Sequence, residues 1–173
     1  MSYCLNKVTI ECTEEESKGI REALTGCDNL FRVLVHFDFN RIIPVPIHLA
    51  ARELNADGRV VKKDPEANAW RLKHWGAELT GYYPDISYAD GILSYEFPTV
   101  TQPEKVIRRL SALYPTNTII HYYLENEFQF HGAVRYRGGQ VVKTGVLHFR
   151  KICVMFGFNN FIDYNYEPDD DEA

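Results

Sequence analysis

The sequence predicts an α+β domain in which helices cover one face of a mostly antiparallel sheet, in a split βαβ arrangement. Short segments with alternating apolar and polar residues predict strands, and segments with apolar residues at helical spacing lie between them. Along the chain the order is strand, helix, strand, an inserted region, strand, helix, strand and a final hairpin extension. The length of 173 residues, with 45% hydrophobic and 25% charged residues, suits one core. We therefore expect residues 1–166 to form a single domain.

The first strand and helix are predicted from local patterns. Residues 3–12 alternate and predict a strand. Thr13 can cap a backbone amide at the start of a helix, and Glu16 completes a capping box, while Gly26 is expected to end that helix. Residues 30–43 are rich in Phe, Val and Ile and predict the second strand, which two prolines close.

Residues 47–90 interrupt this order and are predicted to form a helical insertion. Residues 47–54 and 66–76 have helical patterns, with a turn signal between them. The second of these helices carries both tryptophans, Trp70 and Trp75. Linkers do not carry such residues, so the insertion is expected to be folded.

The remaining strands lie in the second half of the chain. Alternation predicts strands over residues 92–97, 118–125 and 128–137, and a stripe of apolar residues predicts a helix over 103–114. The Gly-Gly pair at 138–139 predicts a hairpin turn into one more strand, the C-terminal hairpin extension.

The net charge of −5 is concentrated at the end of the chain. Without the five acidic residues of the segment 167–173, the chain has 19 acidic and 19 basic residues. A neutral body does not favour a duplex-DNA binder, because phosphate neutralisation normally requires a basic surplus. The tail is predicted to be flexible, and either aids solubility or occupies the basic groove of another protein. Its acidic residues are Glu167, Asp169, Asp170, Asp171 and Glu172.

No motif predicts a catalytic centre or a cofactor. The four cysteines form no CxxC pair and are expected to be reduced, buried thiols. The six histidines have no metal-ligand spacing, although His121 and His131 are expected to approach each other across a hairpin. Nucleophile, phosphate-loop and dinucleotide motifs are absent. We expect a non-enzymatic protein without metal or cofactor, located in the cytoplasm because no targeting segment is apparent.

Two surfaces are candidates for binding. In the insertion, Trp70, Arg71, Lys73 and Trp75 are of types enriched in protein interfaces, although both tryptophans can instead pack the insertion onto the sheet. On the last strands, aromatic and basic residues are expected on the face opposite the core, where they can stack bases and hold phosphates or simply be solvated. The nucleic-acid candidates are Tyr123, His131, Arg135, Arg137 and Lys143.

A further set of segments comprises residues 37–46, 70–77, 93–99, 103–115 and 123–132. Together they resemble the YubB-type (Api-like) ferredoxin-like family of conjugative plasmids and phages. The resemblance implies a ferredoxin-like fold without an iron-sulfur cluster, in an accessory protein of a mobile element, and it supplies no catalytic residues.

Together these observations favour a phage or plasmid accessory protein in the cytoplasm of a bacterial host. Its expected partner is a host protein, for example a defence complex that handles nucleic acid, so that the protein would act as an anti-CRISPR-like, anti-defence inhibitor. The alternative is a single-stranded nucleic-acid-binding module that uses the open sheet face.

Overall fold

A six-stranded antiparallel sheet is the frame of the computed structural model, which describes residues 3–28, 33–54, 64–81, 83–127, 130–145 and 147–158. In spatial order its strands are β4 (Asp85–Ala89), β5 (Ile92–Thr99), β1 (Cys4–Glu11), β6 (Ile119–Glu125), β7 (His131–Arg137) and β8 (Gln140–Gly145). Helix α1 (Glu14–Leu24) follows β1, and helix α5 (Glu104–Leu113) joins β5 to β6. The core order β1-α1-β4-β5-α5-β6, with β5 between β4 and β1, is the split βαβ arrangement of a ferredoxin-like domain. The predicted fold class is confirmed.

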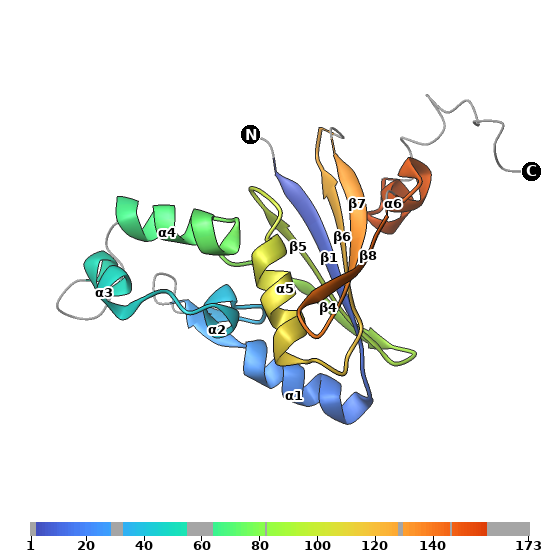
Figure 1. Cartoon of the computed structure of the whole chain (residues 1–173), viewed down its shortest axis with the longest axis horizontal. Coiled ribbons are helices and arrows are strands. Elements are labelled where there is room, and N and C mark those ends of the chain that lie inside the picture. Colours follow the sequence, from blue (N-terminus) through green and yellow to red (C-terminus); the bar gives the residue numbers. More distant parts are fainter. Residues whose placement is uncertain are drawn as a thin grey trace, which may run out of the picture.

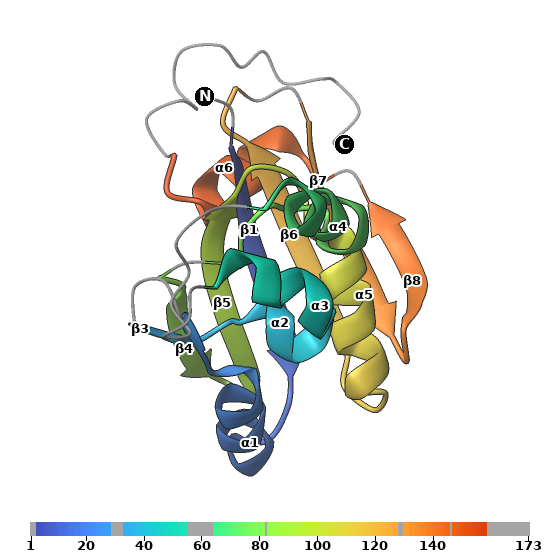
Figure 2. The ribbon, with the colours of Figure 1, turned by 90° about the vertical axis from the view of Figure 1, so that its left-hand side faces the viewer.

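Helices α1 and α5 cover one face of the sheet (Figures 1 and 2). The capping box at Thr13 starts α1 as predicted: the Glu16 amide donates to the Thr13 hydroxyl at 3.2 Å, and the Thr13 amide donates to Glu16 at 2.7 Å. Val106, Ile107 and Leu110 form the buried stripe of α5. These helices pack on the β1 residues that point to the same face, so the main core lies between helices and sheet.

One helix departs from the predicted arrangement. Helix α6 (Phe149–Met155) packs against β6 and β7 from the face opposite α5 (Figure 1). Ile152 and Cys153 of α6 are buried, and so is the side chain of Leu124, which points to this face of β6. The expectation of helices on one face therefore holds for α1 and α5 but not for α6.

The predicted second strand, residues 30–43, is wrong. Strands β2 (Gly26–Asp28) and β3 (Val33–Val35) form a separate two-stranded sheet, and α2 (Phe39–Ile42) follows them. Asp38 caps α2 by accepting from the Asn40 amide at 2.9 Å. Phe37 and Phe39 enter the core as an aromatic group with Phe97 and do not alternate along a strand. Gly26 begins β2 and does not cap α1.

The insertion also begins and ends at other residues than predicted. Strand β4 lies inside the predicted segment 47–90 but belongs to the main sheet, where Ile86 pairs with Tyr95. Asp90 and Gly91, both with positive φ, turn β4 into β5. The insertion into the ferredoxin-like order therefore spans residues 26–84. Besides α2, its helices are α3 (Ile47–Ala50), the 3₁₀ helix η1 (Ala51–Glu53) and α4 (Pro65–Trp75), and these three agree with the predicted helices.

The C-terminal hairpin extension is present as predicted. Arg137 pairs with Gln140, and Gly138 and Gly139 turn the chain with φ values of 57° and 76°. A side chain at Gly139 would meet Ala112 of α5, so this turn also needs glycine for close packing. The acidic tail at 167–173 lies outside the described residues.

Candidate functional site

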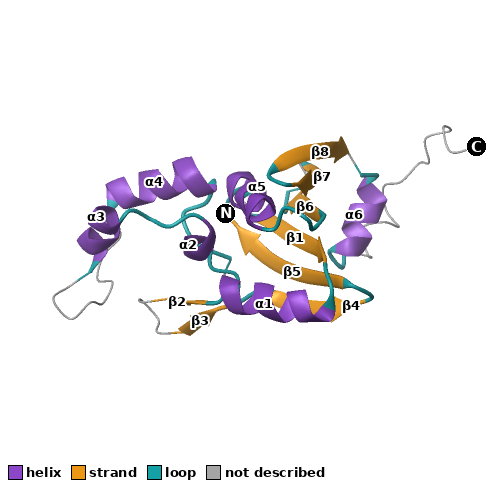
Figure 3. Ribbon diagram, turned by 60° about the horizontal axis from the view of Figure 1, so that its bottom comes forward, coloured by secondary structure: helices purple, strands orange, loops and turns teal. Residues whose placement is uncertain are grey.

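The inserted helices form an arm that extends from the sheet (Figures 1 and 3). We define the arm as α3, η1 and α4, residues 47–54 and 64–75. Asp64 caps α4 through the amides of Glu66 and Ala67, and Gly76 ends it in the left-handed conformation. The Thr101 hydroxyl donates to the Gly76 carbonyl, which attaches the base of the arm to the segment before α5. The local sequence thus sets both ends of the helix.

Trp75 was predicted to bind a partner, but it is buried. Its side chain is 4% exposed, and its indole N–H donates to the Ile43 carbonyl at 2.8 Å. The edge of its ring meets Phe39 at 5.8 Å. Trp75 therefore anchors α4 to the core, and the prediction of a partner contact is wrong for this residue.

Arg71 is likewise engaged inside the arm. Its guanidinium forms two contacts with the carboxylate of Glu53 in η1, one of them at 3.0 Å from Nη1 to Oε1. The side chains are only 14% and 6% exposed, and the guanidinium lies 5.8 Å from the Trp75 ring. Two opposite charges that are mostly removed from water must remain paired, so Arg71 joins η1 to α4 and is not available to a partner. Sequence reasoning missed Glu53, because its partner lies 18 residues away.

Other residues of the arm do face solvent. Lys73 is exposed, Leu72 is 42% exposed and Ile47 is 87% exposed. Trp70 is half-buried and stacks on His74, with ring centroids 4.4 Å apart. Of the four residues predicted in this region, Trp70 and Lys73 are accessible, and Leu72 and Ile47 were not foreseen. Ile47, Trp70, Leu72 and Lys73 are called the arm surface below.

The predicted nucleic-acid site is divided between the two faces of the sheet. Tyr123 pairs with Gly132, on the face that carries the core residues Val8 and Tyr95. His131 pairs with Leu124 and Arg135 with Lys143, on the opposite face, and Arg137 has the same parity as Arg135. Alternation predicts which residues of one strand share a face, but only the register relates the faces of two strands. The five residues do not form one surface.

The face with the basic residues is also partly covered and mixed in charge. His131 makes an edge contact with Phe149 of α6, with centroids 5.3 Å apart. Lys7, on the same face, is paired with Glu96 at 2.5 Å. Arg135, Arg137 and Lys143 are exposed on this face. The single-strand alternative therefore keeps three basic residues, without Tyr123 as a stacking platform.

Asn6 and His121 form a buried polar network that sequence reasoning did not foresee. The Asn6 amide nitrogen donates to the Phe97 carbonyl at 3.2 Å and to the Thr99 hydroxyl at 2.7 Å. Its amide oxygen lies 2.9 Å from Nε2 of His121, so that nitrogen carries the proton. Burial lowers the pKa of His121 to about 3. The network links β1 to its neighbours β5 and β6, so its role is structural.

No metal site is found among the described residues. His121 and His131 point to opposite faces, so the expected approach across a hairpin does not occur. No group of three or more His, Cys, Asp or Glu side chains in the described ranges is arranged to hold an ion. Cys4, Cys12 and Cys153 are buried, whereas Cys27 is exposed, against the expectation of four buried thiols.

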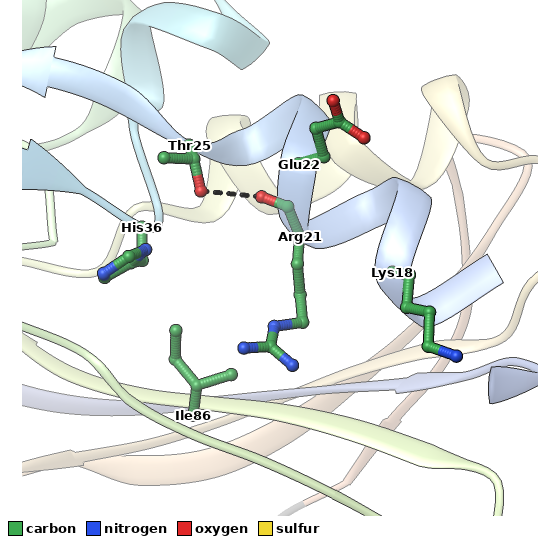
Figure 4. Close-up of a pocket in the computed structure, with 6 residues that line it drawn as sticks. All are labelled: Lys18, Arg21, Glu22, Thr25, His36 and Ile86. Carbon is green, nitrogen blue, oxygen red and sulfur yellow. Dashed lines mark hydrogen bonds between the residues drawn. The ribbon is translucent and has the colours of Figure 1, made fainter. Parts of the chain in front are cut away.

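A pocket opens between α1 and β4 (Figure 4). It has a volume of about 320 Å³ and is lined by Lys18, Arg21, Glu22, Thr25, His36 and Ile86. These residues come from three segments, α1, the end of β3 and β4, so no sequence motif marks the pocket.

Comparisons with known proteins find a similarity in fold to a distant structure. No protein-family model and no curated protein matches the chain. The crystal structure of protein api92 from Yersinia pseudotuberculosis, described with the family model DUF1281, is similar with a TM-score of 0.52 and 19% sequence identity. The match covers 64% of this chain and 39% of that chain, so this chain spans well under half of its neighbour.

This similarity supports the fold at the level of architecture. It agrees with the Api-like part of the resemblance, but it does not extend to the YubB type specifically. Within the described part of the chain, no helix has the length and apolar character needed to cross a membrane. The chain is therefore an α+β protein with a ferredoxin-like frame, and its fold is similar to part of api92.

Proposed function

We propose that this protein is a non-enzymatic binding protein that engages a protein partner through the arm surface. The observation that carries this proposal is the contrast within the arm: its interior is braced by the Glu53–Arg71 ion pair, while Ile47 is 87% exposed and Leu72 is 42% exposed. A braced element that presents large apolar side chains loses little conformational entropy on binding. Trp70, which is half-buried on the same helix as Leu72, is of a type that is enriched at interface centres.

The arm surface also indicates the chemistry of the partner. Ile47 and Leu72 fit an apolar groove, because burial of their side chains would supply most of the binding free energy. Trp70 lies on the other side of α4 from Leu72, since helical residues two positions apart are separated by about 200°, and would contact a different part of the partner. Lys73 lies next to Leu72 and is exposed, so an acidic group at the edge of that groove would complement it. We therefore propose a partner with an apolar groove and an acidic rim.

The biological role is proposed from the family resemblance. A YubB-type accessory protein of a phage or plasmid would act in the cytoplasm of a bacterial host, and a defence complex that handles nucleic acid is the proposed target. An acidic tail can compete with phosphates for a basic groove, which supports an anti-CRISPR-like inhibitor. The tail residues Glu167, Asp169, Asp170, Asp171 and Glu172 would then supply a second contact.

A quantitative pull-down tests the contact. Purified wild-type protein and the double variant Ile47→Asp/Leu72→Asp are incubated with host lysate, and retained proteins are identified by mass spectrometry. The proposal expects one protein to be retained by the wild type and lost by the double variant, with an affinity at least about ten-fold lower for that isolated partner. Leu113→Asp, at an exposed apolar residue of α5, is the matched control and should retain the partner.

Filter binding of labelled single-stranded DNA at two salt concentrations tests the alternative. Salt-dependent retention that is lost in Arg135→Glu/Lys143→Glu, together with unchanged partner capture by the arm variant, would replace the proposal with nucleic-acid binding.

A further inference from the structure

The pocket between α1 and β4 gathers basic groups from two sides. Lys18 and Arg21 lie about one turn apart on α1, and His36 approaches from the end of β3 (Figure 4). The Arg21 side chain extends from the helix toward Ile86, which forms the apolar wall on β4. The pocket therefore combines cationic donors with an apolar surface, a combination that is common in small-molecule sites.

The charge of Arg21 is not balanced inside the described structure. No carboxylate of the described residues forms an ion pair with Arg21. Lys18 contacts Glu14 at 3.0 Å, but the two side chains are 65% and 71% exposed. Such an exposed pair contributes little, so a ligand can displace it at low cost. Both cationic groups are thus available to an anion.

A second unsatisfied group lies nearby. The Tyr95 hydroxyl is buried and has no hydrogen-bond partner among the described residues, and Tyr95 is the register partner of Ile86 in the pocket wall. Burial raises the pKa of Tyr95 well above its ordinary value, and the positive charge of Arg21 opposes this rise. Buried hydroxyls without a partner are uncommon, and among the described residues only Tyr95 and Tyr136 have one.

We propose that this pocket binds a small phosphate monoester with a hydroxyl-bearing body, such as a sugar phosphate. Arg21 binds the phosphate with its forked N–H donors, and Lys18 adds a second positive charge. Ile86 packs against the apolar side of the body. The volume of about 320 Å³ is at the lower end of the range for ligand sites and suits one sugar phosphate.

Thr25 favours a ligand with a hydroxyl group. The Thr25 hydroxyl donates to the Arg21 carbonyl at 2.8 Å, so its oxygen is left to accept a hydrogen bond. Glu22 also borders the pocket, but its carboxylate lies on the side of α1 away from Ile86 (Figure 4), so it does not face a phosphate held by Arg21. A hydroxyl group of a sugar phosphate can donate to Thr25 while the phosphate stays on Arg21.

Calorimetric titration of the full chain with ribose 5-phosphate, inorganic phosphate and ribose tests the proposal. We expect saturable binding of ribose 5-phosphate that is tighter than that of either fragment, and about ten-fold or more weaker in Arg21→Ala. Arg109→Ala, at an exposed arginine of α5, is the matched control and should bind as the wild type does.

Three results would overturn the proposal: no saturable binding of ribose 5-phosphate, equal affinity for inorganic phosphate, or an unchanged affinity in Arg21→Ala. Arg21 is exposed, so its variant should fold, and amide NMR spectra would verify this. Partner capture through the arm surface is expected to be the same in Arg21→Ala as in the wild type, so this proposal and the proposed function fail independently.

Discussion

The ferredoxin-like frame, which is the six-stranded sheet with helices α1 and α5, and the arm are stabilised by different kinds of contact. In the frame, residues such as Val8, Ile107 and Leu110 are completely buried between helices and sheet. In the arm, an ion pair between Glu53 and Arg71 joins η1 to α4, and few apolar side chains are buried. Apolar burial is spread over many residues, whereas the geometry of the arm depends on a few directional contacts.

This difference indicates where the protein tolerates substitutions. A substitution on the arm surface removes no core contact, so it can alter binding while the fold persists. A substitution in the frame alters the stability of the whole protein. The following predictions test this contrast, in order of decreasing effect.

Ile107→Ala should destabilise the whole protein by about 2–5 kcal/mol, because it removes a fully buried side chain of α5 and leaves a cavity. Equilibrium unfolding in urea would measure the loss. Leu113→Ala on the same helix is the control, and since that side chain is 43% exposed, its effect should be within about 0.5 kcal/mol. Equal effects of the two variants would show that α5 does not pack as described.

Glu53→Ala should destabilise the arm by about 3 kcal/mol, because Arg71 would be left without its partner in a mostly buried place. Hydrogen exchange should show the loss in amides of α4, while amides of β1 keep their protection. The double variant Glu53→Leu/Arg71→Met removes both charges and should recover most of the stability. Loss of protection in β1 would show that arm and frame unfold as one unit.

Stability should decrease on acidification because of His121. The pKa of this residue is lowered to about 3 from an ordinary value of 6.5, so below about pH 6.5 the unfolded chain binds a proton that the folded protein does not. The contribution of neutral His121 is complete above pH 6.5 and decreases by about 1.4 kcal/mol per pH unit toward pH 3.

Between pH 6.5 and pH 5 this amounts to a loss of about 2 kcal/mol, measurable as a change in urea midpoint. His121→Gln, which cannot titrate, should be less stable at pH 7 but should show a smaller pH dependence over this range. The same slope in both proteins would contradict the buried, neutral state of His121.

Thr13→Ala should cost about 1 kcal/mol, because it removes the side-chain cap of α1. Thermal unfolding would measure the change, and Thr13→Ser, which keeps the hydroxyl, should remain close to the wild type. A loss of the same size in Thr13→Ser would mean that the methyl group, and not the cap, stabilises this turn.

Local signals in the sequence predicted the elements that depend on neighbouring residues. The capping box at Thr13, the apolar stripe of α5 and the glycine turn at 138–139 are all present. Strand β4 was missed, because its alternation of Ile86 and Tyr88 is short and follows a helical region. The segment 30–43 was assigned to a strand because Phe37 and Phe39 favour strands, although both side chains pack into the core around a helix start.

The candidate sites were predicted less completely, for a related reason. Residue types located the arm, but the burial of Trp75 and the pairing of Arg71 with Glu53 depend on contacts between separate segments. The five residues predicted to bind nucleic acid do not form one surface, because Tyr123 and Arg135 belong to opposite faces. The pocket on α1 was not foreseen, since its residues are more than 60 positions apart in the sequence, from Lys18 to Ile86.

The sequence by itself determined the helix caps, the turns, most strands and the α+β class, because these follow from periodicity and from the conformational preferences of adjacent residues. Only the tertiary structure decided which faces meet, which charges are paired and which aromatic residues are exposed. These features depend on strand register and on packing between distant segments, where a shift of one residue moves every side chain of a strand to the other face.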